Sequence, residues 1–343
     1  MTWVVWRYYR AQMAIALALL AAFAAVELTT GLQMASAWHS LLRTCSATAV
    51  NGSGNSCSGG SIIGFLGNDM RVLSVLAPAI IGILWGAPLV AHEMETGTAT
   101  FAWTQGITRS RWLLAKAGWL LLAAAVWGGA VSALVTFWSG PVNAMRGDQF
   151  DGNFFETQGI VPIGYAVFAT ALGITAGALL RRTLPAIAVT LGGFIGIRIL
   201  LDGLRPHLMP AVTTITSLTS NWSPPGISWV LGLNVINKAG QIVSYSGFSS
   251  TEVDSLPVSA LPQACQKLVP AGYASGGNIT SAPRGNPLGP VQSCLQSAGF
   301  RQAVTYQPGW RYWPFQGIET GIYLLLAAAL VAVAWYAVRR RDA

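Results

Sequence analysis

Charged residues are scarce in this sequence. They make up 9% of its 343 residues, while hydrophobic residues make up 53%. Soluble globular domains average about 25% charged residues, so this composition excludes an ordinary soluble domain and indicates an integral membrane protein. The formal net charge is +8, but the longest basic run is only Arg339 to Arg341, directly after an apolar stretch. Such a run typically anchors a membrane helix, and we expect no nucleic-acid partner.

Common catalytic motifs are also missing. The sequence contains no GxxxxGK[ST], HExxH, GxSxG or CxxC pattern, so it cannot hold ATP phosphates by the first of these routes. The three histidines, His39, His92 and His207, are scattered. We therefore predict no catalytic residue, no metal and no cofactor bound by this chain, and we do not interpret it as an enzyme.

Long apolar runs dominate what is present. A helix needs roughly 20 residues to cross a hydrocarbon core about 30 Å thick. Six stretches approach or exceed this length, at about residues 11–32, 72–91, 112–138, 160–180, 184–201 and 317–338. The predicted fold is an all-α polytopic membrane protein with six transmembrane helices. We divide it into a transmembrane bundle (1–201), a large extracellular α/β insertion (202–316), and a sixth span with a basic tail (317–343).

Basic residues indicate the orientation of the spans. Arg7 and Arg10 precede the first span, and Arg181 and Arg182 separate the fourth from the fifth. Because cytoplasmic segments carry an excess of Lys and Arg, we predict cytoplasmic termini and a location in the plasma membrane.

The four cysteines all lie in segments predicted to be outside. Cys45 and Cys57 share the first outside loop, and Cys265 and Cys294 share the insertion. Four cysteines allow three pairings, and only these two local pairs keep each disulfide within one segment. An oxidising exterior would form and retain them. The alternative is four unpaired thiols.

Two stretches of the insertion carry local structural signals. The segment from Trp229 to Tyr245 predicts two short strands around a turn at Asn237 to Gly240. Residues 208–222 are moderately apolar but contain or adjoin several prolines. We interpret them as interfacial or re-entrant, with a seventh span as the alternative.

A few charged residues fall inside the predicted spans or at their ends, in the outer third of the bilayer. They are Glu27, Arg198, Asp202 and Glu319. A lone charge at this depth costs several kcal/mol, so partners are expected. Arg198 and Asp202 stand four positions apart and can pair directly on one helical face. The cluster either lines an exit path and its outer gate or forms structural ion pairs that fix helix packing.

The polar segment 92–111 joins the second and third spans. It carries Glu93 and Glu95 at its start and Arg109 and Arg111 at its end. It is either a short helix that docks into a cytoplasmic partner or a solvated loop whose charges set the topology.

The same segment, HEMETGTATFAWTQGITRSRWLLAK, resembles the stretch after the second span in bacterial ABC type-2 exporter permeases, in particular those of actinobacterial type. The resemblance rests on Glu93, Glu95, Gly97, Thr98, Thr104, Gln105, Arg109, Arg111 and Trp112. RPHLMP and YQPGWRYWPFQGIETGIYL also resemble stretches after the fifth span and into the sixth of that group.

The resemblance implies that the chain is the permease subunit of an ATP-driven efflux transporter. ATP and Mg would then be bound by a separate ATP-binding subunit, and a second permease copy, the same or a sister chain, would complete the path. The coupling residues implied are Glu93, Glu95, Gly97, Thr98, Gln105, Arg109 and Arg111. A drug, antibiotic, peptide or lipid could be the substrate.

Aromatic residues gather just before the sixth span, namely Trp310, Tyr312, Trp313 and Phe315. They suit a membrane-interface belt or an exit-gate contact with an amphipathic substrate. Two other functions remain open. One is a membrane-anchored sensor with an extracellular ligand domain, and the other is a proton-coupled carrier that uses Glu27, Asp202 and Glu319.

Overall fold

The structure, a computed structural model, describes residues 2–44, 77, 80, 82–97, 108–146, 150, 152–218, 227–246, 257–269, 274–275, 278–279 and 289–340. The chain divides into two compact units. We call Met1–Gly203 together with Trp313–Ala343 the membrane unit, and Leu204–Tyr312 the inserted unit.

The membrane unit is helical. Its elements are α1 (Thr2–Thr44), the π-helix η1 (Gly82–Gly86), α4 (Ala87–Glu95), α6 (Arg109–Arg146), α7 (Gly152–Phe155), α8 (Val161–Leu180), α9 (Thr183–Leu204) and α12 (Tyr312–Arg340). In the described part, four segments are long and apolar enough to cross a membrane, namely Arg109–Gly140, Val161–Leu180, Thr183–His207 and Gly309–Arg340. A shorter apolar stretch, Leu17–Gln33, lies within α1. The prediction of a helical membrane protein is therefore confirmed. Six spans stay a prediction, because only residues 77, 80 and 82–91 of the stretch 72–91 are described and Leu17–Gln33 is shorter than a full span.

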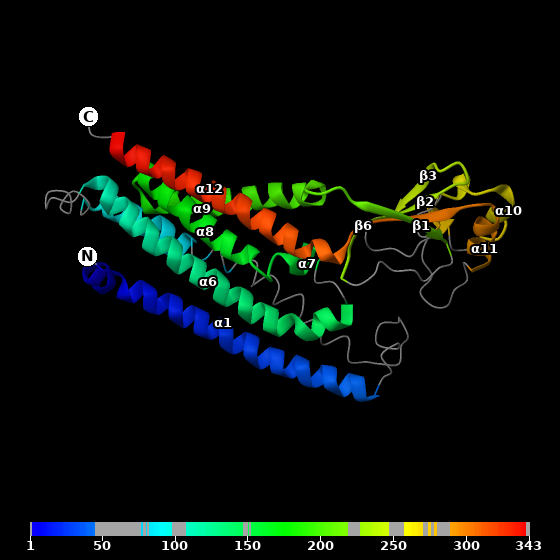
Figure 1. Ribbon diagram of the computed structural model, residues 1–343, viewed down its shortest axis with the longest axis horizontal. Helices are drawn as coiled ribbons and strands as arrows, with labels where there is room; N and C mark the ends of the chain where they lie inside the picture. Colours follow the sequence, from blue (N-terminus) through cyan, green and yellow to red (C-terminus); the bar gives the residue numbers. More distant parts are fainter. Residues whose placement is uncertain are drawn as a thin grey trace. The chain divides into compact units, whose positions relative to one another are not determined.

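Helix α8 is the most enclosed helix of this unit (Figure 1). Its sequence is apolar or small on every side, as expected for a helix surrounded by protein. Pro162 occupies its first turn, where the missing N–H would have no partner within the helix. The helix ends at Arg181, whose φ of 54° is left-handed and whose N–H donates to Gly177 O at 3.0 Å. α9 starts two residues later, so the junction is very short.

η1 and α4 approach α8 at backbone distance. A Cβ added to Gly86 would lie 2.7 Å from the carbonyl oxygen of Thr170, and one added to Gly173 would lie 2.6 Å from the nitrogen of Ala87. Only glycine fits such positions. The end of the second predicted span is thus seated directly on the α8 backbone.

Helix α1 runs alongside α6 (Figure 1). Leu20 and Phe23 pack against a cluster that includes Trp127 and Val131. Farther along, the indole Nε1 of Trp138 donates to the hydroxyl of Thr30 at 3.0 Å. Both contacts advance in the same direction, so the two helices are parallel.

The inserted unit contains an antiparallel sheet of four strands in the order β1-β6-β2-β3. The strands are β1 (Val212–Ser217), β2 (Trp229–Ile236), β3 (Ile242–Ser246) and β6 (Arg301–Gln307). β2 and β3 form the predicted hairpin, and the side chain of Asn237 accepts hydrogen bonds from the N–H groups of Ala239 and Gln241 in its turn. Shorter elements are η3 (Arg205–His207), η4 (Val258–Ala260), β4 (Ala274–Ser275), β5 (Asn278–Ile279) and η5 (Gly309–Arg311).

The structure corrects the interpretation of residues 212–217, which belong to the stretch 208–222 predicted to be interfacial or re-entrant. Val212–Ser217 is a β-strand that pairs with β6, from Val212 opposite Tyr306 to Ser217 opposite Arg301. Its sequence, VTTITS, is rich in β-branched residues, which favour strands. The neighbouring prolines keep the strand short. In the sequence they resemble interruptions of an apolar helix, which explains the wrong prediction.

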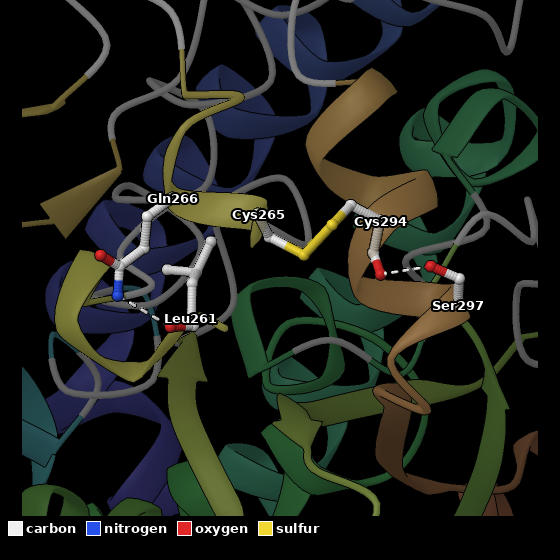
Figure 2. Close-up of a disulfide and its surroundings, with 5 residues drawn as sticks. All are labelled: Leu261, Cys265, Gln266, Cys294 and Ser297. Atoms are coloured by element: carbon white, nitrogen blue, oxygen red, sulfur yellow. Dashed lines mark hydrogen bonds between the residues drawn. A yellow bond between two sulfur atoms is a disulfide. The ribbon is translucent and has the colours of Figure 1, made fainter. Parts of the chain in front are cut away.

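One disulfide braces the core of the inserted unit. Cys265 in α10 (Gln263–Gln266) is bonded to Cys294 in α11 (Gly289–Ser297), as Figure 2 shows. The predicted pairing is thus confirmed for these two cysteines. Around the bond, Leu218, Val235, Leu261, Val291, Leu295 and Phe300 form a buried apolar cluster. The other predicted pair, Cys45 and Cys57, lies outside the described residues.

Candidate functional site

The end of α4 is fastened to α6 by a buried ion pair. Lys116 Nζ contacts Glu93 Oε2, and both side chains are almost fully buried. The ammonium group also lies 4.5 Å from the ring centroid of Trp112, which favours a cation over the ring face. Removing one partner of such a pair would leave a buried charge without compensation. The pair therefore fixes α4 against the first turns of α6.

A second contact fastens the end of α4 to α9. Glu95 Oε2 accepts hydrogen bonds from the backbone N–H of Thr183 at 3.1 Å and from its hydroxyl at 2.7 Å. A carboxylate at a helix N-terminus satisfies free N–H groups and complements the helix dipole. These hydrogen bonds, helped by the charges of His92 and Arg182, lower the pKa of Glu95 below its ordinary value of 4.5. Glu95 thus caps α9 from another part of the chain.

Residues 96–108, which we call the connector, link α4 to α6. Thr98 and Gln105 lie outside the described residues, as do Thr104 and most of the connector. Gly97 is exposed at the start of the connector with a φ of 74°, and Arg111 is exposed in the first turn of α6. Two of the predicted coupling residues bind other helices of the same chain, Glu93 on α6 and Glu95 on α9. Two others, Arg109 and Arg111, lie in the first turn of α6, which follows the connector.

A polar chain joins α8, α9 and α12 at the opposite end of the bundle. Arg198 in α9 forms an ion pair with Glu156, which precedes α8. The Arg198 guanidinium also lies 4.7 Å from the ring centroid of Tyr165. The hydroxyl of Tyr165 donates to Glu319 Oε1 on α12 at 2.6 Å. Two of the four predicted intramembrane residues, Arg198 and Glu319, are therefore linked, through Tyr165.

Gln316 adds four hydrogen bonds at the same end of the bundle as Arg198 and Glu319. Its Oε1 accepts hydrogen bonds from the N–H groups of Ile160 and Val161, at 2.9 and 3.0 Å, and its Nε2 donates to the carbonyl oxygens of Phe155 and Gln158. The amide of an α12 residue thereby satisfies the N-terminus of α8. Nearby, Ser132 donates to Gly159 O at 2.5 Å and Asn143 donates to Gln158 Oε1 at 3.1 Å. The contacts join α6, α8 and α12.

Sequence reasoning missed Glu156, Tyr165 and Gln316 as members of this site. Glu156 lies between the predicted spans 112–138 and 160–180, where a charged residue is common. Tyr165 lies inside the second of these spans, among apolar residues. Gln316 offered a weak signal, because an amide beside an apolar run needs hydrogen-bond partners.

The other two predicted intramembrane residues are Glu27 and Asp202. Glu27 is fully buried on α1, and in the described part of the chain its carboxyl oxygens have no hydrogen-bond partner. Asp202 is exposed, one helical turn after Arg198. Of the four residues of the predicted cluster, the described contacts link Arg198 and Glu319, while Glu27 has no hydrogen-bond partner among the described residues.

The four predicted gate aromatics differ in exposure. Trp310 and Trp313 are 71% and 62% exposed, which suits an interface belt. Tyr312 and Phe315 are buried, and the ring of Phe315 lies 5.3 Å from that of Phe150. Phe315 is therefore a core residue of the membrane unit.

In the described residues, no three His, Cys, Asp or Glu side chains are grouped so that they could hold a metal ion.

Comparison with known proteins identifies the family. No curated protein and no solved structure matches the chain. Residues 17–205 match the family described as ABC-2 membrane transporter related. The matched segment is more than half of the sequence, and it contains α6, α8, α9 and both contacts at the end of α4. The chain therefore belongs to the ABC-2 membrane transporter related family, whose members are membrane components of ABC transporters.

Proposed function

We propose that this protein is the permease subunit of an ATP-driven exporter in the plasma membrane, and that a separate ATP-binding subunit docks on the connector. ATP and Mg would be bound by that subunit. Two permease copies would enclose the transport path, and an amphipathic drug, antibiotic, peptide or lipid would be the cargo. Family membership supports the permease role.

The observation that carries the coupling role is the attachment of α4 on both sides. Glu93 binds Lys116 of α6, and Glu95 caps α9 at Thr183. α4 also rests on the α8 backbone. A push on the end of α4 would therefore reach three long helices, α6, α8 and α9.

Charge supports the orientation that docking requires. Arg109, Arg111, Arg181, Arg182, Arg339 and Arg340 lie at the ends of α6, α8 and α12 that meet near the connector. Since cytoplasmic ends of spans carry the excess of basic residues, we place the connector and both termini in the cytoplasm. The polar chain through Tyr165 is then on the outer side, where its opening would accompany release of the cargo.

The test is co-expression with a candidate ATP-binding subunit, followed by co-purification and ATPase assays. Arg111→Glu and Gln105→Ala should weaken co-purification, because they alter the docking surface. Lys116→Glu should leave co-purification intact but abolish cargo-stimulated ATPase activity, and the charge-swapped pair Glu93→Lys with Lys116→Glu should restore part of it. Fluorescence-detected size-exclusion chromatography checks that the wild type is folded. If the folded wild type binds no ATP-binding subunit, the proposal is wrong.

The sensor alternative is favoured by one feature, the separate compact inserted unit with its disulfide. A sensor would bind a ligand there without moving it. Uptake of labelled cargo into inverted membrane vesicles in the presence of ATP distinguishes the two functions, since only a transporter accumulates the cargo.

A further inference from the structure

Glu27 is a buried acid that no contact described above uses. It lies in the apolar stretch of α1, its relative exposure is 0%, and neither carboxyl oxygen accepts a hydrogen bond within the described residues. Charged side chains inside membrane spans normally face a partner or a water-filled path. This carboxyl has neither in the described structure.

The hydroxyl groups of Thr30 and Ser132 at this interface are already engaged. Glu27 shares the α1 face of Phe23 and Thr30, which packs on α6. The hydroxyl of Thr30 donates to Val26 O at 2.6 Å and accepts the bond from Trp138. On α6, Ser132 donates to Gly159 O. The indole N–H of Trp127, in the cluster that packs against Phe23, is buried without a partner among the described residues and donates no hydrogen bond to Glu27.

The neighbouring elements also lack a compensating charge. On α6 no Asp, Glu, His, Lys or Arg occurs between Lys116 and Arg146, and on α1 none occurs between Arg10 and Glu27 or between Glu27 and His39. The second predicted span has none from 72 to 91, although Arg71 precedes it and His92 follows it. Along these elements, the groups nearest in sequence are several helical turns away.

An ionised carboxylate in such surroundings would be strongly disfavoured, because burial without a donor or a counter-charge penalises the charged form. We infer that Glu27 is a proton-binding site of the membrane unit. Its carboxyl is protonated while α1 packs on α6 as described, and it is deprotonated when that interface opens to water. The step is a simple acid dissociation, in which the O–H bond of the carboxyl breaks and water takes the proton.

The position of α6 links this site to the connector. α6 begins at the end of the connector and is held there by Lys116 and Glu93, and its later turns pack on the α1 face that carries Glu27. Movement of α6 by the docked subunit would therefore change the access of water to Glu27. This link rests on the proposed function, whereas the protonation of Glu27 does not.

The first experiment uses the purified full-length chain in lipid nanodiscs, without any ATP-binding subunit. Infrared spectroscopy at pH 7 should show the C=O stretch of a protonated carboxylic acid, with its shift in D2O, in the wild type. Glu27→Gln and Glu27→Met should both lose this band, and Glu95→Gln, which removes an exposed carboxylate, should keep it. A wild type without the band, or a Glu27→Gln protein that retains all of it, overturns the inference.

The second experiment tests the link in the complex with the ATP-binding subunit. ATPase activity is measured from about pH 5.5 to 8.5. Burial moves the titration of a carboxyl group upward into this pH range. The wild type should show a pH-dependent step of severalfold that Glu27→Gln lacks. If the infrared band is present but the two pH profiles coincide, the proton site stands and its link to the transport cycle is wrong. If no complex forms, the proposed function fails while the infrared result still decides the site.

Discussion

The side chain of Gln316 occupies the space where Gly159 would carry a Cβ. A Cβ on Gly159 would lie 2.6 Å from Gln316 Oε1, and the backbone φ of Gly159 is 71°. The glycine is therefore needed twice, for its left-handed conformation and for the close approach of an amide that satisfies the α8 N-terminus.

Replacing this glycine should destabilise the membrane unit. Gly159→Ala incurs about 1–2 kcal/mol for the left-handed backbone and also displaces the Gln316 amide from its hydrogen bonds. The matched control is Gly118→Ala, because Gly118 lies in α6 with open space around its missing Cβ and alanine is the better helix former. Thermal unfolding in nanodiscs should show a lower Tm for the first variant only. Equal Tm values would contradict the close contact.

The bond from Tyr165 to Glu319 can be measured by a double-mutant cycle. Tyr165→Phe keeps the ring under Arg198 but removes the hydroxyl, and we expect a loss of about 1–3 kcal/mol, because a buried acceptor loses its donor. Glu319→Gln should reduce the effect of Tyr165→Phe, since the charge-assisted bond is already weakened. Additive losses in chemical unfolding would show that the two groups do not interact.

The cap that Glu95 places on α9 should depend on pH. The pKa of Glu95 is lowered in the folded protein, chiefly by the hydrogen bonds from Thr183. The stabilisation is therefore complete above the unfolded pKa, near 4.5, and is lost as the pH falls through the lower folded value. The Tm difference between wild type and Glu95→Gln should shrink on acidification below that point. Thr183→Ala should remove only part of it, because the backbone N–H remains.

The disulfide should stabilise the inserted unit separately. Cys265 and Cys294 are 29 residues apart, and closing a loop of that size contributes about 3–4 kcal/mol by restricting the unfolded chain. The double variant Cys265→Ala with Cys294→Ala should be cleaved by protease within residues 204–312 at lower concentrations than wild type. The far-ultraviolet helical signal of the membrane unit should change little. Equal protease sensitivity would show that the bond is dispensable.

Local patterns allowed much of the helical part to be anticipated. α8 and α9 lie close to the expected stretches 160–180 and 184–201, because Arg181 and Arg182 interrupt two otherwise continuous apolar runs. α6 continues to Arg146, beyond the expected end at 138. Its extra turns contain Ser139 and Asn143, and the latter is held by Gln158, a partner that periodicity cannot show.

The polar contacts were less predictable because their partners are distant in sequence. Glu95 meets Thr183, and Tyr165 meets Glu319, only after the helices have packed. The sequence marks each charge as unusual without identifying the group that faces it. The strand β1 was misinterpreted for the same reason, since its partner β6 lies near the far end of the inserted unit.

The central strand β6 gives the inserted unit a fixed order of biogenesis. β6 pairs with β1 on one side and β2 on the other, and Thr213 contacts Thr305 across 92 positions. During synthesis, β1 therefore has no partner strand until β6 has been made, and β6 ends five residues before α12 begins. The sheet closes as the last helix is made, so a nascent chain stopped before Arg301 would carry unpaired strand edges prone to association.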